Sequence, residues 1–170
     1  MSSLFIVLLG GRHQRAKIEV HDIAVAIGET LEGIYPQLKQ AWFGEQSGLH
    51  IDAWAKIQGL EFEGKSYRIQ FTNAQPHPDD QKLYLINLGG YESAEFGEQH
   101  RYVLVIAQNS KLAKERGKQH FAQNWQKQHV DRVVDVDDCI EIDQVQGRYV
   151  ELVESDFEPN HWENSYIILS

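Results

Sequence analysis

Four short apolar runs dominate the pattern of hydrophobic and polar positions along the chain. They cover residues 4–9, 23–27, 83–88 and 102–107. The first run is apolar at every position, which is typical of a central strand that is buried on both faces. We therefore expect four strands, and the pair Gly10-Gly11 ends the first of them.

A helix is predicted after the second apolar run. Thr30 is placed to cap its first turn, and Pro36 requires either a kink or a helix that begins near Tyr35. The apolar face of this helix is formed by Leu31, Ile34, Tyr35, Leu38 and Trp42. The second half of the chain carries a similar segment, in which Asn109-Ser110 takes the capping position.

Alternating polar and apolar residues follow the predicted helix. Residues 49–57 and 67–71 alternate as strands do, and Glu63-Gly64 supplies a turn between them. Each half therefore predicts a β-β-α-β-β unit. The expected fold class is α+β, with a largely antiparallel sheet and helices packed on it.

The two halves of the chain repeat each other. Residues 4–11 match residues 83–90 at an offset of 79, as LFIVLLGG and LYLINLGG. The same offset places Glu19 on Glu98 and His21 on His100. After about six residues inserted near 123–128, the match resumes at an offset of 85 and places Asp52 on Asp137. We interpret the chain as a tandem duplication.

The duplication suggests a domain organisation. Residues 1–75 form the first repeat, residues 76–82 a linker with two prolines, and residues 83–170 the second repeat with a C-terminal strand. Because a unit of about eighty residues is only marginally stable alone, we expect the repeats to share one core around a pseudo-twofold axis.

Composition and charge restrict the partners of the protein. The 25 acidic residues outnumber the 16 basic ones, and the formal net charge of −9 argues against nucleic acid and anionic membranes as partners. The one cysteine, Cys139, fits a reducing compartment, and no run of about 18–20 apolar residues predicts a membrane span. We expect a cytoplasmic protein, and the sequence permits a homo-oligomer.

The repeated glycines and Glu-x-His motifs are the main candidates for a site. The ligand-binding positions predicted from them and from the matched aspartates are Gly10, Gly11, Glu19, His21, Asp52, Gly89, Gly90, Glu98, His100 and Asp137. In the functional interpretation, the glycines admit a ligand to the backbone, and the carboxylate and imidazole bind a metal or shuttle a proton. In the structural interpretation, the glycines make a tight turn and the histidines tie down a long loop.

A metal site does not follow from these motifs alone. Glu-x-His supplies two ligands, whereas zinc takes three or four. A third ligand could come from Asp52, from Asp137 or from the twin motif. No metal, cofactor or catalytic residue is therefore assigned. The acidic residues 135–143 are interpreted as a solvated strand face, and Cys139 as a buried or half-buried small residue.

Several of these segments resemble a known bacterial family. They are the strand end at residues 9–11 (LGG), the Glu-x-His motif that precedes an apolar run, and residues 50–54 (HIDAW). Together they are similar to the family called domain of unknown function 1543. Residues 86–91 (INLGGY) through His100 resemble it more closely still, and the resemblance spans roughly residues 4–152. The family carries its domain in one or two copies, and the resemblance implies no reaction.

Three functions remain open. The leading hypothesis is the binding of a small polar ligand or a protein partner at the surface between the two repeats. The second is a small-molecule enzyme in which His21 or His100 acts as general base. This enzymatic hypothesis is favoured if one of these histidines lies in a shared cleft near Asp52 or Asp137. The third is an interaction module that has no ligand site.

Overall fold

The computed structural model describes residues 2–91, 94–124 and 135–169. All strand pairs among these residues are antiparallel, and helices pack against two of the three sheets, so the fold is α+β. Most of the insertion predicted near residues 123–128 lies outside the described residues. No helix in the described part of the chain is both long and apolar enough to span a membrane.

The first sheet belongs mainly to the N-terminal half, and we call it the N-half sheet. Its strand order is β11-β3-β1-β2. Its strands are β1 (Ser3–Gly11), β2 (Val20–Gly28), β3 (His50–Ile57) and β11 (His161–Ile168). The C-terminal strand, which we assigned to the second repeat, thus pairs with β3 of the first.

The helix that covers the N-half sheet begins where the proline predicts. A 3₁₀ turn, η1 (Glu32–Ile34), precedes α1 (Tyr35–Ala41), so Pro36 falls in the first helical turn, where its missing N–H costs nothing. The Thr30 hydroxyl accepts a hydrogen bond from the Gly33 N–H at 3.2 Å. The predicted start near Tyr35 is confirmed. The predicted Thr30 cap is wrong, because the N-cap residues of α1 and η1 are Ile34 and Leu31 and the Thr30 hydroxyl closes the turn that precedes the helix.

The second sheet belongs to the C-terminal half, and we call it the C-half sheet. Its strands are β6 (Lys82–Tyr91), β7 (Glu98–Ala107) and β8 (Asp135–Glu141), in the order β7-β6-β8. Helix α2 (Ser110–Asn124) packs against all three strands. The Asn109 side chain accepts a hydrogen bond from the Leu112 N–H and caps this helix.

A third sheet joins the halves, and we call it the shared sheet. Its order is β4-β5-β10-β9, and the pairing of β5 with β10 crosses from one half to the other. Its strands are β4 (Gly59–Phe62), β5 (Lys65–Thr72), β9 (Gln144–Val145) and β10 (Arg148–Glu154). The first half therefore has three strands after its helix, and the second half has four with β11 included, so both have more strands than the predicted β-β-α-β-β unit.

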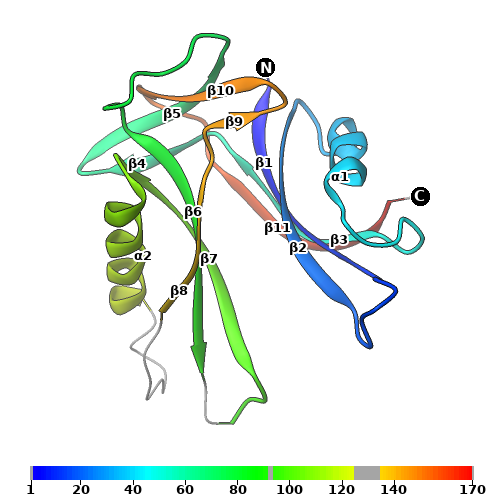
Figure 1. The fold of residues 1–170 in the computed structure, drawn as a ribbon. Helices are drawn as coiled ribbons and strands as arrows, with labels where there is room; N and C mark the ends of the chain where they lie inside the picture. Colours follow the sequence, from blue (N-terminus) through cyan, green and yellow to red (C-terminus); the bar gives the residue numbers. More distant parts are fainter. Residues whose placement is uncertain (1, 92–93, 125–134, 170) are drawn as a thin grey trace.

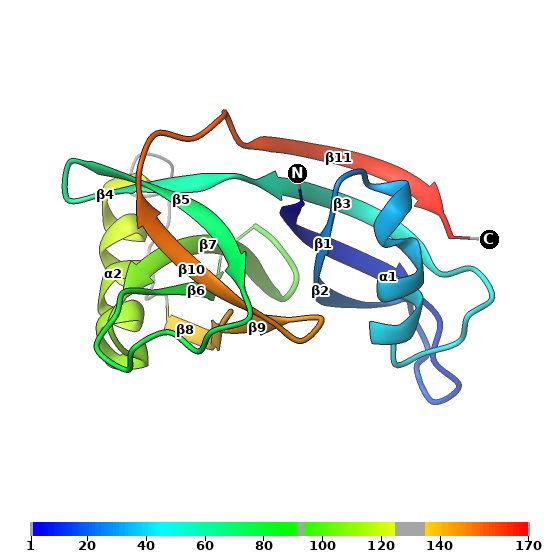
Figure 2. The same ribbon diagram turned by 90° about the horizontal axis from the view of Figure 1, so that it is seen from above.

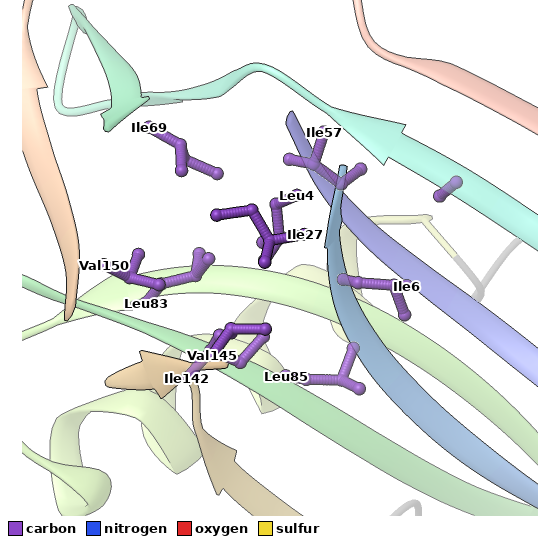
Figure 3. Packing of buried hydrophobic residues seen from close by; sticks show 11 residues of the cluster. Leu4, Ile6, Ile27, Ile57, Ile69, Leu83, Leu85, Ile142, Val145 and Val150 are labelled. Atoms are coloured by element: carbon purple, nitrogen blue, oxygen red, sulfur yellow. The ribbon is translucent and has the colours of Figure 1, made fainter. Parts of the chain in front are cut away.

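Strand β1 shows how the apolar pattern builds the core. Phe5, Val7 and Leu9 pack against α1, whereas Leu4 and Ile6 point to the opposite face. That second face meets residues of the other half, such as Leu83 and Leu85, in one buried cluster (Figure 3). The two halves thus share a core. It stabilises both the N-half sheet and the C-half sheet, which we call the two arms of the molecule.

The two hairpins β1–β2 and β6–β7 diverge from this shared core (Figure 1). Seen from above, the shared sheet and α2 lie beside the N-half sheet, and β11 runs along its edge (Figure 2). The free ends of the hairpins, where the two Gly-Gly pairs lie, point away from the core. This places the predicted site residues on the two arms rather than inside the core.

Candidate functional site

A groove of about 480 Å³ lies between the two arms. Its volume falls in the range of about 300–1,000 Å³ that is typical of small-molecule sites. Its N-half lining includes Leu8, Ile23, Ala53 and Trp162, and its C-half lining includes Leu88, His100, Arg101 and Tyr102. Burial raises the pKa of Tyr102, with contributions from Asp138 and Asp22, which are carboxylates of the two different halves.

The first cluster of polar residues surrounds Gly10. Strand pairing places Gly10 opposite His21 on β2 and opposite His50 on β3. A Cβ built on Gly10 would lie 2.5 Å from His50 Nε2 and 2.5 Å from Asp52 Oδ2. Glycine is therefore required here, because any larger residue would fill the space that these side chains occupy.

Four side chains meet in this first cluster. His21 Nε2 lies 3.0 Å from Asp52 Oδ2 and 3.4 Å from Glu19 Oε1. His50 Nε2 lies 3.4 Å from Asp52 Oδ1 and 3.5 Å from Glu19 Oε1. The donor atoms of Glu19, His50 and Asp52 all lie within 4.8 Å of one another, so these residues could hold a cation.

A β-bulge in β3 positions Asp52. The pairing of β3 with β1 shifts between Leu8 and Leu9, so Asp52 has no partner in β1. Bulges of this kind re-aim a side chain and are frequent beside active sites. The extra residue turns the Asp52 carboxylate toward both histidines.

The second cluster repeats this arrangement around Gly89. Gly89 pairs with His100 on β7, and a Cβ built on it would lie 2.5 Å from Glu98 Oε1 and 2.2 Å from Asp137 Oδ2. His100 Nδ1 lies 3.2 Å from Asp137 Oδ2. Asp137 is again the extra residue of a bulge, because β8 shifts its pairing with β6 between Asn87 and Leu88.

The second cluster has no counterpart of the buried His50. Asp135 occupies the matching position opposite Gly89, and it forms an ion pair with Lys118 at 2.9 Å. Lys118 holds the pKa of the Asp135 carboxyl below its ordinary value, helped by a backbone hydrogen bond from Val136. This carboxylate is thus engaged outside the cluster.

The structure brings together eight of the ten residues selected from the sequence. Gly10, Glu19, His21 and Asp52 meet in the first cluster, and Gly89, Glu98, His100 and Asp137 in the second. The two remaining glycines do not join them. A Cβ on Gly11 would lie 2.8 Å from the ring of Trp42 on the α1 side, and Gly90 faces away from Gly89 by strand alternation.

Sequence reasoning missed His50. It precedes Asp52 by two residues, at the start of an alternating strand, and its match at the offset of 85 is an aspartate. The available signal was the spacing: residues two apart on a strand share a face. Cys139 is half-buried as expected. Burial raises the pKa of its thiol, which disfavours a reactive thiolate.

Comparison with known proteins identifies relatives of this chain. The sequence model of the family described as Domain of Unknown Function (DUF1543) matches residues 16–71. A crystal structure of a protein Il1583 from Idiomarina loihiensis is 31% identical, with a TM-score of 0.73, and the match covers 100% of this chain and 99% of that one. The chain belongs to the DUF1543 family. No curated protein matches it in sequence.

The DUF1543 match lies in the first half, whereas the resemblance noted in the sequence extended to residues 4–152. The matched segment contains Glu19, His21, His50 and Asp52 but ends before β6. The part of this DUF1543 chain that fits the family model is thus the part that carries the first cluster.

Proposed function

We propose that the protein binds a small organic ligand in the groove between its two arms. The supporting observation is the 480 Å³ groove, to which both halves contribute side chains. A site at the junction of two packed units is where ligand pockets are common. The interaction module without a ligand site stays a third prediction.

The lining favours a ligand that has an apolar body and a polar head. Leu8, Ile23 and Ala53 offer apolar surface from three adjacent strands of the N-half sheet. The Trp162 side chain also lines the groove, although 58% of it is exposed. His100 and Arg101 supply polar groups on the opposite wall. The lining thus refines the small polar ligand that the sequence favoured.

The probe for this proposal is 8-anilinonaphthalene-1-sulfonate, which combines aromatic rings with an anionic head. We expect it to bind at one site per chain, with a rise in fluorescence. Ala53→Phe should abolish this signal, because the ring would fill the groove from β3. Ala74→Phe, at an exposed alanine outside the groove, serves as the matched control.

The proposal fails if Ala53→Phe binds the probe as the parent protein does. Urea unfolding of both variants shows whether they keep the folded state. A probe signal that survives in Ala53→Phe and is lost only on unfolding would place the probe on another surface.

The enzymatic hypothesis is a second candidate, and one contact favours it. His100 lines the groove and lies 3.2 Å from Asp137, which could orient the ring as a general base. His21 lies 3.0 Å from Asp52 and is 46% exposed. A panel of chromogenic esters and phosphoesters tests this candidate, and any turnover should fall in His100→Ala but not in His77→Ala.

We also infer that the halves are duplicated units. The orders β3-β1-β2 and β8-β6-β7 agree, and both bulges occur at equivalent steps of β1 and β6. The turns Glu63-Gly64 and Gln146-Gly147 adopt nearly the same positive φ values, 51° and 75° in the first and 50° and 75° in the second. These correspondences support a duplication of the β-β-α-β-β-β unit.

A further inference from the structure

We propose that Glu19, His21, His50 and Asp52 form a binding site for a divalent transition-metal ion, with zinc as the best fit. This site is separate from ligand binding in the groove, and it stands on the geometry of the first cluster.

The donor atoms are spaced as they are around a tetrahedral ion. Ligand atoms about 2.0–2.2 Å from zinc lie about 3.3–3.6 Å apart when they occupy the corners of a tetrahedron. Glu19 Oε1 lies 3.4 Å from His21 Nε2 and 3.5 Å from His50 Nε2, and Asp52 Oδ1 lies 3.4 Å from His50 Nε2, all within this range. The Asp52 Oδ2 atom lies closer to His21 Nε2, at 3.0 Å, so His21 would complete the set formed by Glu19, His50 and Asp52 after a small shift. Charge-assisted hydrogen bonds are shorter, at about 2.7–2.9 Å.

The His50 ring is held in the form that binds metals. Its Nδ1 lies 2.8 Å from the carbonyl oxygen of Gly48, and since a carbonyl only accepts, Nδ1 carries the proton. In the neutral ring Nε2 then presents a lone pair. Histidine ligands commonly donate their other N–H to a backbone carbonyl in this way.

The lone pair on His50 Nε2 accepts no hydrogen bond from the described residues. The side chain is 2% exposed, and Nε2 is buried without a hydrogen-bond partner. Asp52 Oδ2 is likewise buried, and its 3.0 Å contact with His21 Nε2 does not have hydrogen-bond geometry. Buried polar atoms are normally satisfied. A Cβ built on Gly10 would lie 2.5 Å from both His50 Nε2 and Asp52 Oδ2, so the two atoms converge on one small space. A cation satisfies both.

Two neighbours fix the ring in place. Gly48 has a φ of +77°, a conformation that favours glycine, and it directs its carbonyl at Nδ1. The ring of Tyr166 on β11 lies 4.4 Å from the His50 ring, measured between centroids. The C-terminal strand thus helps to hold a residue of the first half.

The donor set selects among metals. Imidazole nitrogens suit zinc and its transition-metal neighbours, whereas calcium and magnesium prefer six or more oxygen ligands. Glu19 and His21 are 40% and 46% exposed, so the site is open to solvent on one side. The second cluster offers only one imidazole, His100, because Asp135 replaces His50. It should bind zinc more weakly.

The test uses the full chain, treated with a chelator and then titrated with Zn²⁺ by calorimetry. We expect one strong site per chain. Since loss of a residue that merely supports a ligand weakens binding by about 10–100-fold, His50→Ala should weaken this site by at least about 100-fold. Bound Co²⁺ should show the intense visible absorption of a tetrahedral ion.

The control substitutions are made in the second cluster and at an exposed histidine. Asp135→Ala changes the position that matches His50, and His77→Ala removes a histidine that is 70% exposed. Both should leave the strong site unchanged. Glu19→Gln and His21→Ala alter exposed side chains, so they test the site even if His50→Ala fails to fold.

The proposal is overturned if the chain binds no zinc, or if Glu19→Gln and His21→Ala bind it as strongly as the parent protein. It is also overturned if Asp135→Ala or His77→Ala removes the strong site. The Ala53→Phe variant should bind zinc normally, so failure of the groove proposal and failure of the metal site give different results.

Discussion

Replacing Gly10 by alanine is the sharpest test of how the first cluster is built. The added Cβ would lie 2.5 Å from both His50 Nε2 and Asp52 Oδ2, well inside normal contact distance. The His50 ring cannot easily move away, because it is buried, hydrogen-bonded to the Gly48 carbonyl and packed against the ring of Tyr166. We therefore expect Gly10→Ala to destabilise the protein.

The size of the effect follows from two opposed terms. Forcing an extra methyl group into a packed site costs about 1–3 kcal/mol. Replacing a strand glycine by alanine recovers roughly 0.5–1 kcal/mol of backbone entropy. The net loss is at most about 2.5 kcal/mol and is centred near 1 kcal/mol. For a chain of this size a loss of about 1 kcal/mol lowers the melting temperature by roughly 2–4 °C.

Gly89→Ala is the matched comparison. Its Cβ would come still closer to its neighbours, at 2.2 Å from Asp137 Oδ2 and 2.5 Å from Glu98 Oε1. Both atoms end flexible carboxylates, and the Asp137 side chain is 30% exposed, so they can turn toward solvent. We expect a smaller loss than for Gly10→Ala.

The assay is urea unfolding followed by tryptophan fluorescence, with thermal unfolding beside it. Gly33→Ala is the control, because its Cβ would meet no atom closer than 3.3 Å. If Gly10→Ala is as stable as the parent protein, or if Gly89→Ala loses more, then His50 is not fixed as described and the reasoning is refuted.

Two further predictions concern a tie between two sheets and a carboxylate that joins two strands of one sheet. Asn160→Ala should lower the free energy of unfolding, measured in urea, by about 1–3 kcal/mol. The reason is that the Asn160 amide accepts a hydrogen bond from Gly59 N and donates one to Gly59 O, where the chain passes between two sheets. Asn160→Asp should recover part of the loss, and full stability in Asn160→Ala would contradict this account. Burial acts to raise the pKa of the Glu141 carboxyl, but hydrogen bonds from Lys82 and Tyr84 hold it below its ordinary value. Its contribution to stability is therefore present above about pH 4.3, the usual pKa of glutamate, and is lost as the pH falls through the lower folded-state pKa. The stability advantage of the parent protein over Glu141→Gln should shrink on acidification, and an advantage that grows would show the opposite sign.

The strands were predictable because a strand that is buried on both faces is apolar at every position, whichever elements cover it. Residues 4–9 are apolar at every position, and β1 is covered on both faces by α1 and by the shared core. The start of α1 was predictable as well, since Pro36 is tolerated only in the first turn of a helix. These local rules act within a few residues.

The break between β3 and β4 was not predictable from local rules. The alternation predicted a strand over residues 49–57 and no further strand before the turn at Glu63-Gly64. In the structure the chain leaves the N-half sheet after Ile57 and enters the shared sheet at Gly59. Asn160, about a hundred residues away, fixes this crossing through hydrogen bonds to the backbone. Contacts of that separation leave no periodic signal in the sequence.

The same limit explains why His50 was missed while the Glu-x-His motifs were found. Those motifs recur in both halves, so the repeat itself marked them. His50 has Asp135 as its counterpart, and because these two residues differ, the repeat does not mark either position. It enters the cluster through strand pairing, since β3 runs beside β1 and places His50 opposite Gly10.

The two clusters share a frame that is set by the backbone, and they differ in one ring. Glycine on the central strand, a bulge that turns an aspartate inward and a Glu-x-His motif on the neighbouring strand occur in both halves. The first half adds the buried imidazole of His50, whereas Asp135 of the second half pairs with Lys118 outside the cluster. Since most of the frame is common to both arms, the proposed metal site predicts that this position dominates any difference in metal affinity between them. A chain with two equal metal sites would therefore contradict the role given to His50.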